Sequence, residues 1–366
     1  MRSFAVVALL AAYSLHAQTS TPSAAAITKN PVPVVTLSFG SPQQTPLGQK
    51  GAAMLDNTTC SPDGSLFLVI AGSPEKMDFA LNSLTNGTED VRFAASPGSE
   101  YEYVGWPAHY FAGDDSVVTL ISAEIRKNPM EESQSANPQE VTLALVYNRK
   151  GTLEHVVPIP QDFDATSIGM YGSGDLLVVA KDPVRNGLRL LVLDKDGDKK
   201  NELSLFDYDY DTGQKTRKKQ PLAKVFDAAD FIQIVQDGDN LLLVPTGTAA
   251  TVIEVNEQGI VRATDLQLPP GYLLRSLLSM DGGYWTVSTY MDAKILSNPQ
   301  PGTTGVVFRN GPLFQFNSFD GGLVRRIDSP ANLNNGVRCA HNGEFTALTT
   351  DKKTGRLEVL TGSIPR

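Results

Sequence analysis

The sequence has few residues of the kinds that build reactive centres: 2 cysteines, 2 tryptophans and 4 histidines among 366 residues. His109, His155 and His341 stand far apart, without the short spacing that metal ligands on one element share. The sequence contains no Gly-x-Ser-x-Gly nucleophile elbow, phosphate-cradling glycine loop or dinucleotide fingerprint. These absences exclude the enzyme classes that such motifs define, but His, Ser and Asp residues from distant segments could still converge in the fold.

Basic residues are also in the minority, with 31 Lys and Arg against 40 Asp and Glu and a net charge of −9. Non-specific binding to nucleic acid or to anionic lipid needs a basic surface. We therefore expect no nucleic-acid partner, and we interpret the negative charge as a property that keeps the protein soluble.

Long apolar runs are absent except near the N-terminus, where Phe4 to Leu15 are almost all apolar and follow Arg2. The run is shorter than the roughly 20 residues that span a bilayer, and small residues precede Gln18. We predict a cleaved signal peptide at residues 1–17, with a retained membrane anchor as the alternative. No later stretch is apolar enough for a membrane span, so the protein is expected to be secreted or periplasmic.

The segment after the expected cleavage site, residues 18–31, is rich in Ser, Thr, Ala and Pro. Such a composition buries too little apolar surface to offset the entropy of ordering, and it predicts a flexible leader. Residues 32–366 are then expected to form a single all-β domain.

One short pattern recurs along that domain: a turn rich in Asp, Gly and Asn, followed by a strongly apolar strand. Its six copies begin at Asp63, Asp114, Ser173, Asp237, Asp281 and Asn342. A second pattern follows each copy, an apolar strand ending in a polar or glycine turn, as in Leu190 to Gly197. Each repeat therefore predicts four strands, A to D, of one β-propeller blade, with tight A–B hairpins that need positive φ.

Six copies predict a six-bladed β-propeller of four-stranded antiparallel blades. The last repeat ends after strand C, Leu357 to Leu360, whereas Pro33 to Phe39 is a strand with no hairpin before it. Placing this N-terminal strand as strand D of the last blade closes the ring and hides the sheet edges. Seven blades, two packed sandwiches or a larger open sheet are the alternatives.

The two cysteines occupy matching places in the first and last repeats. Cys60 and Cys339 each lie four residues before a turn glycine, Gly64 and Gly343. Ring closure makes these blades neighbours, so an exported protein could join the two residues by a disulfide. Two buried free thiols are the alternative.

The turn sequences resemble those of a known group. Ser61-Pro62-Asp63-Gly64 and the turn from Asp194 to Gly197 are similar to turns of NHL-repeat and TolB-like six-bladed propellers. The resemblance covers nearly all of the mature chain, although Asp115 stands where the second repeat should have its turn glycine. Such groups include binding proteins, lyases, lactone hydrolases and quinoprotein dehydrogenases, so the resemblance implies a fold and no single activity.

Long insertions fall on one face of the predicted propeller, in the B–C and D–A connections at 128–140, 207–219 and 291–305. Residues that enter each strand A would surround the channel mouth on this face. The candidate ligand-binding residues are Asp56, Trp106, His109, Asp164, Asp230, Arg275, Asn335 and Arg338, with Asn57, Asp227 and Asn334 beside them. This mixed set suits a small polar ligand. Alternatively, these side chains only cap turns and solvate the channel.

We expect no metal or cofactor, with one weak exception. Asp207, Asp209 and Asp211 alternate as calcium ligands do, but Lys218 stands where the bidentate Glu should be. The sequence thus favours a propeller that binds a small polar ligand or a protein partner on its long-loop face. The alternatives are a hydrolase or lyase with carboxylates at the channel mouth, and a scaffold protein of the cell envelope.

Overall fold

The computed structural model describes residues 32–44, 58–73, 76–83, 89–103, 109–126, 139–182, 187–203, 209–210, 220–221, 229–247, 250–295, 306–330, 333, 336–354 and 356–365. All named elements in these ranges are β-strands, so the all-β prediction is confirmed there. None of the described residues forms a helix able to cross a membrane. The predicted signal peptide and leader lie outside the described residues, and Val32–Arg366 forms one compact unit.

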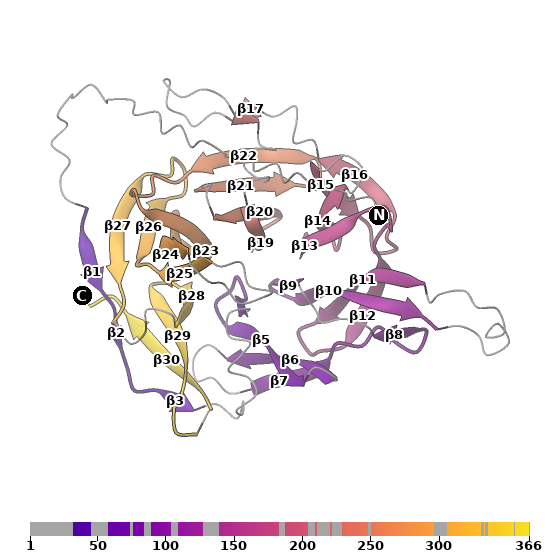
Figure 1. The fold of residues 1–366 in the computed structure, drawn as a ribbon, viewed down its shortest axis with the longest axis horizontal. Coiled ribbons are helices and arrows are strands. Elements are labelled where there is room, and N and C mark those ends of the chain that lie inside the picture. Colours follow the sequence, from indigo (N-terminus) through magenta and orange to yellow (C-terminus); the bar gives the residue numbers. More distant parts are fainter. Residues whose placement is uncertain are drawn as a thin grey trace, which may run out of the picture. The chain divides into compact units, whose positions relative to one another are not determined.

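Two sheets each contain four strands in antiparallel, sequential order (Figure 1). The first consists of β4 (Thr59–Cys60), β5 (Leu66–Ser73), β6 (Lys76–Ser83) and β7 (Glu89–Ala94). The second consists of β13 (Asp164–Met170), β14 (Leu176–Asp182), β15 (Gly187–Leu193) and β16 (Lys199–Leu203). This is the arrangement of strands A to D in a propeller blade.

A larger sheet contains two more sets in the same order, linked by a single residue pair, Gly247 with Leu274. One set is β19 (Ala229–Asp237), β20 (Asn240–Gly247), β21 (Thr251–Asn256) and β22 (Gly259–Asp265). The other is β23 (Tyr272–Asp281), β24 (Tyr284–Ile295), β26 (Leu313–Asn317) and β27 (Leu323–Asp328). A short separate pair is formed by β17 (Asp209–Tyr210) and β18 (Gln220–Pro221).

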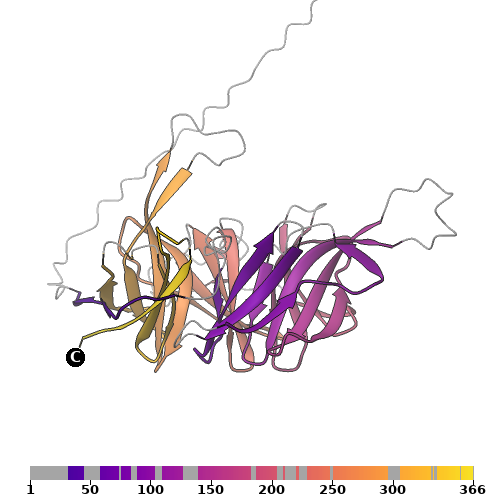
Figure 2. The ribbon, with the colours of Figure 1, turned by 90° about the horizontal axis from the view of Figure 1, so that it is seen from below.

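One of the three predicted insertions, 291–305, begins as an extended strand. β24 continues through residues 291–295 and pairs there with an extra strand, β25 (Val306–Asn310), which projects beyond the sheet (Figure 2). The sheet of β9 (His109–Ala112), β10 (Ser116–Ile125), β11 (Glu140–Asn148) and β12 (Leu153–Pro158) likewise carries β8 (Tyr101–Tyr103) at the far end of β10. The insertion predicted at 291–305 therefore starts with ordered strand residues, because 291–295 find backbone partners in β25.

The N-terminal strand is divided between two sheets. β1 (Val34–Thr36) pairs in parallel with β27, while β2 (Ser38–Phe39) and β3 (Gln43–Gln44) pair with β30 (Leu357–Ser363). β30 belongs with β29 (Glu344–Thr350) and β28 (Val337–His341). Leu37, between β1 and β2, is buried in the cluster where these two sheets pack. The predicted single strand from Pro33 to Phe39 was therefore only partly right, because its hydrogen bonds pass from one sheet to the other at Leu37.

Apolar side chains on both faces of the sheets form the core. On β5, Leu66 and Leu68 pack into one cluster, whereas Phe67 and Val69 pack into another. Successive strand residues point to opposite faces, so a strand buried on both sides needs a continuous apolar run. The apolar runs after each hairpin turn in the sequence have this physical cause.

The structure joins Cys60 of β4 and Cys339 of β28 in a disulfide, with Cα atoms 5.9 Å apart. The two cysteines have equal spacing from a turn glycine, but the hairpins that contain them differ in length. Cys60 pairs with Phe67 across a longer turn, whereas Cys339 pairs with Thr346 in a hairpin that closes where His341 meets Glu344. Both cysteines nevertheless point into one apolar cluster that contains Phe67.

Candidate functional site

Four of the predicted ligand-binding residues have described side chains. His109, Asp164, Arg275 and Arg338 lie at or near the first residue of β9, β13, β23 and β28. Asp230 lies on β19, but its side chain is not among those described. Asp56, Asn57, Trp106, Asp227, Asn334 and Asn335 lie outside the described residues.

His109 and Asp164 approach one another from two neighbouring strands, β9 and β13. Burial lowers the pKa of His109, and the negative charge of Asp164 acts in the opposite direction. The His109 carbonyl also accepts a hydrogen bond from Thr119 Oγ1 at 3.0 Å, which fixes the start of β9. Burial is the larger of the two effects on the His109 imidazole, and Asp164 is the charged group that opposes it.

A second pair brings Arg338 close to Tyr110, the residue after His109. Burial raises the pKa of Tyr110, and the cationic Arg338 acts to lower it. The ring of Tyr110 packs edge-on against Phe79, with 5.9 Å between centroids. Its hydroxyl is buried and has no hydrogen-bond partner among the described residues. The sequence analysis missed Tyr110, because an aromatic residue in a β-strand first indicates core packing.

Arg275 belongs to a different cluster. Its guanidinium donates a hydrogen bond to Asn310 Oδ1 at 2.8 Å and lies 5.3 Å from the centre of the Tyr290 ring. Tyr290 and Asn310 lie on β24 and β25, so Arg275 supports the projecting hairpin.

The calcium candidates lie mostly outside the described residues. Asp207 and Asp211 are among the residues not described, and Asp209 begins β17 without a described side chain. No group of three or more His, Cys, Asp or Glu residues in the described part of the chain is arranged to hold a metal ion. In the other Asp-rich segment, Asp194 Oδ1 accepts hydrogen bonds from the backbone N–H groups of Asp196 and Asp198, both at 2.9 Å, as turn chemistry requires.

Asp265, at the end of β22, is a carboxyl group that burial strongly perturbs. Burial raises its pKa from 3.8 to about 6, and Thr251 donates a hydrogen bond to Oδ1 at 2.9 Å. Between about pH 4 and pH 6, the Asp265 carboxyl group therefore keeps its proton in the folded state but has lost it in the unfolded state. Stability contributed by this group is consequently lost as the pH rises through that window.

The variant Asp265→Asn keeps the hydrogen-bond acceptor and removes the charge. At pH 7.5 we expect its free energy of unfolding to exceed that of the wild type by about 1 kcal/mol, after allowance for partial exposure, and its melting temperature to be higher. At pH 4 the two proteins should differ little. Thermal unfolding across this pH range measures the difference. Asp162→Asn, at an exposed turn, is the control for loss of one charge. If the difference in stability between Asp265→Asn and the wild type is the same at pH 4 and pH 7.5, the raised pKa of Asp265 is contradicted.

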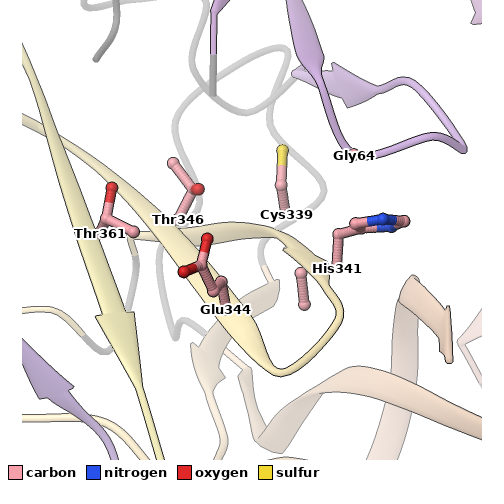
Figure 3. Close-up of a pocket in the computed structure, with 7 residues that line it drawn as sticks. Gly64, Cys339, His341, Glu344, Thr346 and Thr361 are labelled. Atoms are coloured by element: carbon pink, nitrogen blue, oxygen red, sulfur yellow. The ribbon is translucent and has the colours of Figure 1, made fainter. Parts of the chain in front are cut away.

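A small hollow lies at another place, where the β28–β29–β30 sheet meets the turn after β4. Its walls are Gly64, Cys339, Ala340, His341, Glu344, Thr346 and Thr361 (Figure 3). The sequence analysis did not find it, because threonine is common in strands and Glu344 belongs to a hairpin turn.

No family model and no curated protein matches the chain in sequence. Among solved structures, a member of the DUF4221 family from Bacteroides vulgatus is similar, with a TM-score of 0.45, 8% identity, and coverage of 90% of this chain and 98% of that one. Hydrazine synthase from Kuenenia stuttgartiensis matches with a TM-score of 0.39, 15% identity, and coverage of 87% and 76%. The GH43 protein BlXynB from Bacillus licheniformis matches with a TM-score of 0.38, 10% identity, and coverage of 83% and 61%. Similarities this distant carry no functional argument.

Proposed function

We propose that the protein is an exported six-bladed β-propeller that binds a small polar ligand at the mouth of its central channel. The observation that carries the proposal is a pair of electrostatic contacts at the starts of first strands. The charge of Asp164 on β13 acts on His109 of β9, and the charge of Arg338 on β28 acts on Tyr110, the next residue of β9.

Contacts between the first strands of successive sheets support six blades in a closed ring. β4 contacts β9, β9 contacts β13, β13 contacts β19, β19 contacts β23, β23 contacts β28, and β28 contacts β4. The short strands β2 and β3 add the fourth position to the β28–β29–β30 sheet. Both features favour closure by the N-terminal segment. The relationship to NHL-repeat and TolB-like propellers is a proposal based on the turn sequences.

The chemistry of the mouth favours a ligand that carries an acidic group. A guanidinium donates to carboxylates and phosphates, and the Tyr110 hydroxyl offers a further donor that the described protein does not use. A buried polar group without a partner costs free energy, so a ligand that accepts its hydrogen bond recovers that cost. Export is supported by the apolar N-terminal segment and by the disulfide, which is typical of oxidising compartments.

The pairing of His109 with Asp164 favours an enzyme as the second candidate function. An imidazole whose pKa is lowered by burial can act as a general base when a substrate brings a proton within its reach. In that case the protein would be a hydrolase or lyase with its reacting groups at the same mouth.

The variant Tyr110→Phe tests the binding proposal because it removes only the hydroxyl. Without ligand it should be as stable as the wild type or more stable by about 1 kcal/mol, since it removes an unsatisfied buried group. Isothermal titration with citrate, galacturonate and uncharged galactose should show binding of an acidic probe, weakened about tenfold in Tyr110→Phe and in Arg338→Met.

Arg356→Met serves as the control, because Arg356 is exposed and lies on the turn before β30. It should bind the acidic probe with wild-type affinity. Equal loss in Arg356→Met, or a Tyr110→Phe variant that is less stable than the wild type, would count against the site.

A further inference from the structure

The hollow beside the β28–β29–β30 sheet collects polar side chains on one face of that sheet. Thr346 on β29 pairs with Cys339 on β28 and with Thr361 on β30, and Glu344 pairs with His341. Directly paired residues, and residues two positions apart on a strand, share a face. Glu344, Thr346 and Thr361 therefore point to the same side, and Figure 3 shows them together, with His341 and the Gly64 turn opposite.

The same face is apolar one step further along the strands. Leu348 follows Thr346 by two residues on β29, and Val359 precedes Thr361 by two residues on β30. Both pack with Phe67 and Val69 in the cluster that contains the disulfide. The change from apolar to polar side chains coincides with the hollow, so the polar groups line an opening rather than fill an interface.

The oxygen atoms of Glu344, Thr346 and Thr361 are available to a ligand, since these side chains make no hydrogen bond or ion pair within the described structure. Two other turn carboxylates are occupied: Asp63 accepts a hydrogen bond from Arg149 Nη1 at 2.8 Å, and Asp175 is paired with Lys200. The hollow thus presents one carboxylate and two hydroxyls without internal partners.

His341 forms a wall of the hollow, and each of its ring nitrogens has a polar neighbour. Its Nε2 lies 2.7 Å from Asn342 Nδ2, and its Nδ1 lies 3.8 Å from Asp281 Oδ1. The ring also packs against Gly64, where an added Cβ would lie 2.1 Å from the imidazole. These contacts hold the imidazole in place, so the free acceptors of the hollow are the three oxygen-bearing side chains.

We propose that this hollow binds a primary ammonium group. An ammonium carries three N–H donors and no acceptor, which matches three oxygen-bearing acceptor side chains, and a carboxylate makes the charge-assisted bond. The hollow is small and Glu344 at its rim is exposed, so the ammonium enters while its alkyl chain extends towards solvent. Calcium is a poorer match, since it prefers six to eight oxygen ligands. The proposal is independent of the channel mouth.

Isothermal titration of the full mature chain with n-propylammonium chloride tests this assignment. n-Propanol keeps the shape without the charge, and tetramethylammonium keeps the charge without donors. At matched ionic strength, only propylammonium should bind saturably. An equal response to tetramethylammonium, or no saturable binding up to about 50 mM propylammonium, would overturn the proposal.

Two variants locate the binding. Glu344→Gln should weaken it at least about tenfold, and Thr361→Val, which keeps the shape of the side chain, should weaken it about threefold. Glu140→Gln, at an exposed position on β11, should leave propylammonium affinity unchanged. Wild-type affinity in a Glu344→Gln variant with a wild-type melting temperature would show that the hollow is not the site.

Discussion

The double variant Cys60→Ala/Cys339→Ala is expected to be less stable than the oxidised wild type by about 3 kcal/mol. The disulfide joins residues 279 positions apart, so it removes much of the conformational freedom of the unfolded chain. It also anchors β4, which has only two residues paired with β5. Removing the bond therefore weakens the contact between β4 and β28 as well as freeing the unfolded state.

Urea unfolding of three samples separates the bond from the side chains: oxidised wild type, reduced wild type and the double variant. Reduced wild type keeps both sulfur atoms in the apolar cluster, so it isolates the effect of the covalent link. We expect reduced wild type and the variant to lie within about 1 kcal/mol of each other and well below the oxidised protein. Identical midpoints for oxidised and reduced wild type would refute the stabilising role of the disulfide.

The strand order was predictable because each hairpin carries its own local signals. Glycine supplies positive φ in several of these turns, with φ of 67° at Gly64 and 92° at Gly174, and apolar runs follow because the strands are buried on both faces. The division of the N-terminal strand was not predictable in this way. Alternation shows which side chains of residues 33–39 are buried, but it does not show which sheet edge accepts their hydrogen bonds.

The candidate site was predictable only in part, for a related reason. The start of each first strand can be read from the repeats, and this placed His109, Asp164 and Arg338 on the list of candidates. Which of these side chains meet depends on their directions in the folded chain. Arg275, for example, donates a hydrogen bond to Asn310. Tyr110 and Thr361 carry no sequence signal of their own, since aromatic and β-branched residues are ordinary components of strands.

Gly321 is expected to be the least replaceable of the turn glycines. It has a φ of +67°, and an added Cβ would lie 1.8 Å from the backbone oxygen of Asp265 and 2.7 Å from its carbonyl carbon. Gly321 follows β26, whereas Asp265 ends β22 of the neighbouring set of strands. Its carbonyl accepts a hydrogen bond from the Gln267 N–H at 2.9 Å, so the two backbones are held together. Because both colliding groups are backbone, neither can rotate away.

Two other turn glycines also lie close to a neighbouring sheet. A Cβ at Gly197 would lie 2.6 Å from the Pro158 carbonyl oxygen, and one at Gly151 would lie 2.7 Å from the Phe93 ring. In each case the turn between the third and fourth strands of one sheet meets the last strand of the sheet before it. The spacing between successive sheets therefore depends on the absence of a side chain at this turn.

The variant Gly321→Ala should lose about 3 kcal/mol of stability, of which about 1 kcal/mol is the cost of a left-handed backbone for alanine and the rest is the collision. Gly282→Ala is the matched control, since Gly282 has a φ of +57° and no atom within 4 Å of its added Cβ. It should lose only about 1 kcal/mol. Urea unfolding of both variants measures the difference. An equal loss would mean that backbone conformation alone, rather than close contact between neighbouring sheets, requires glycine at this turn.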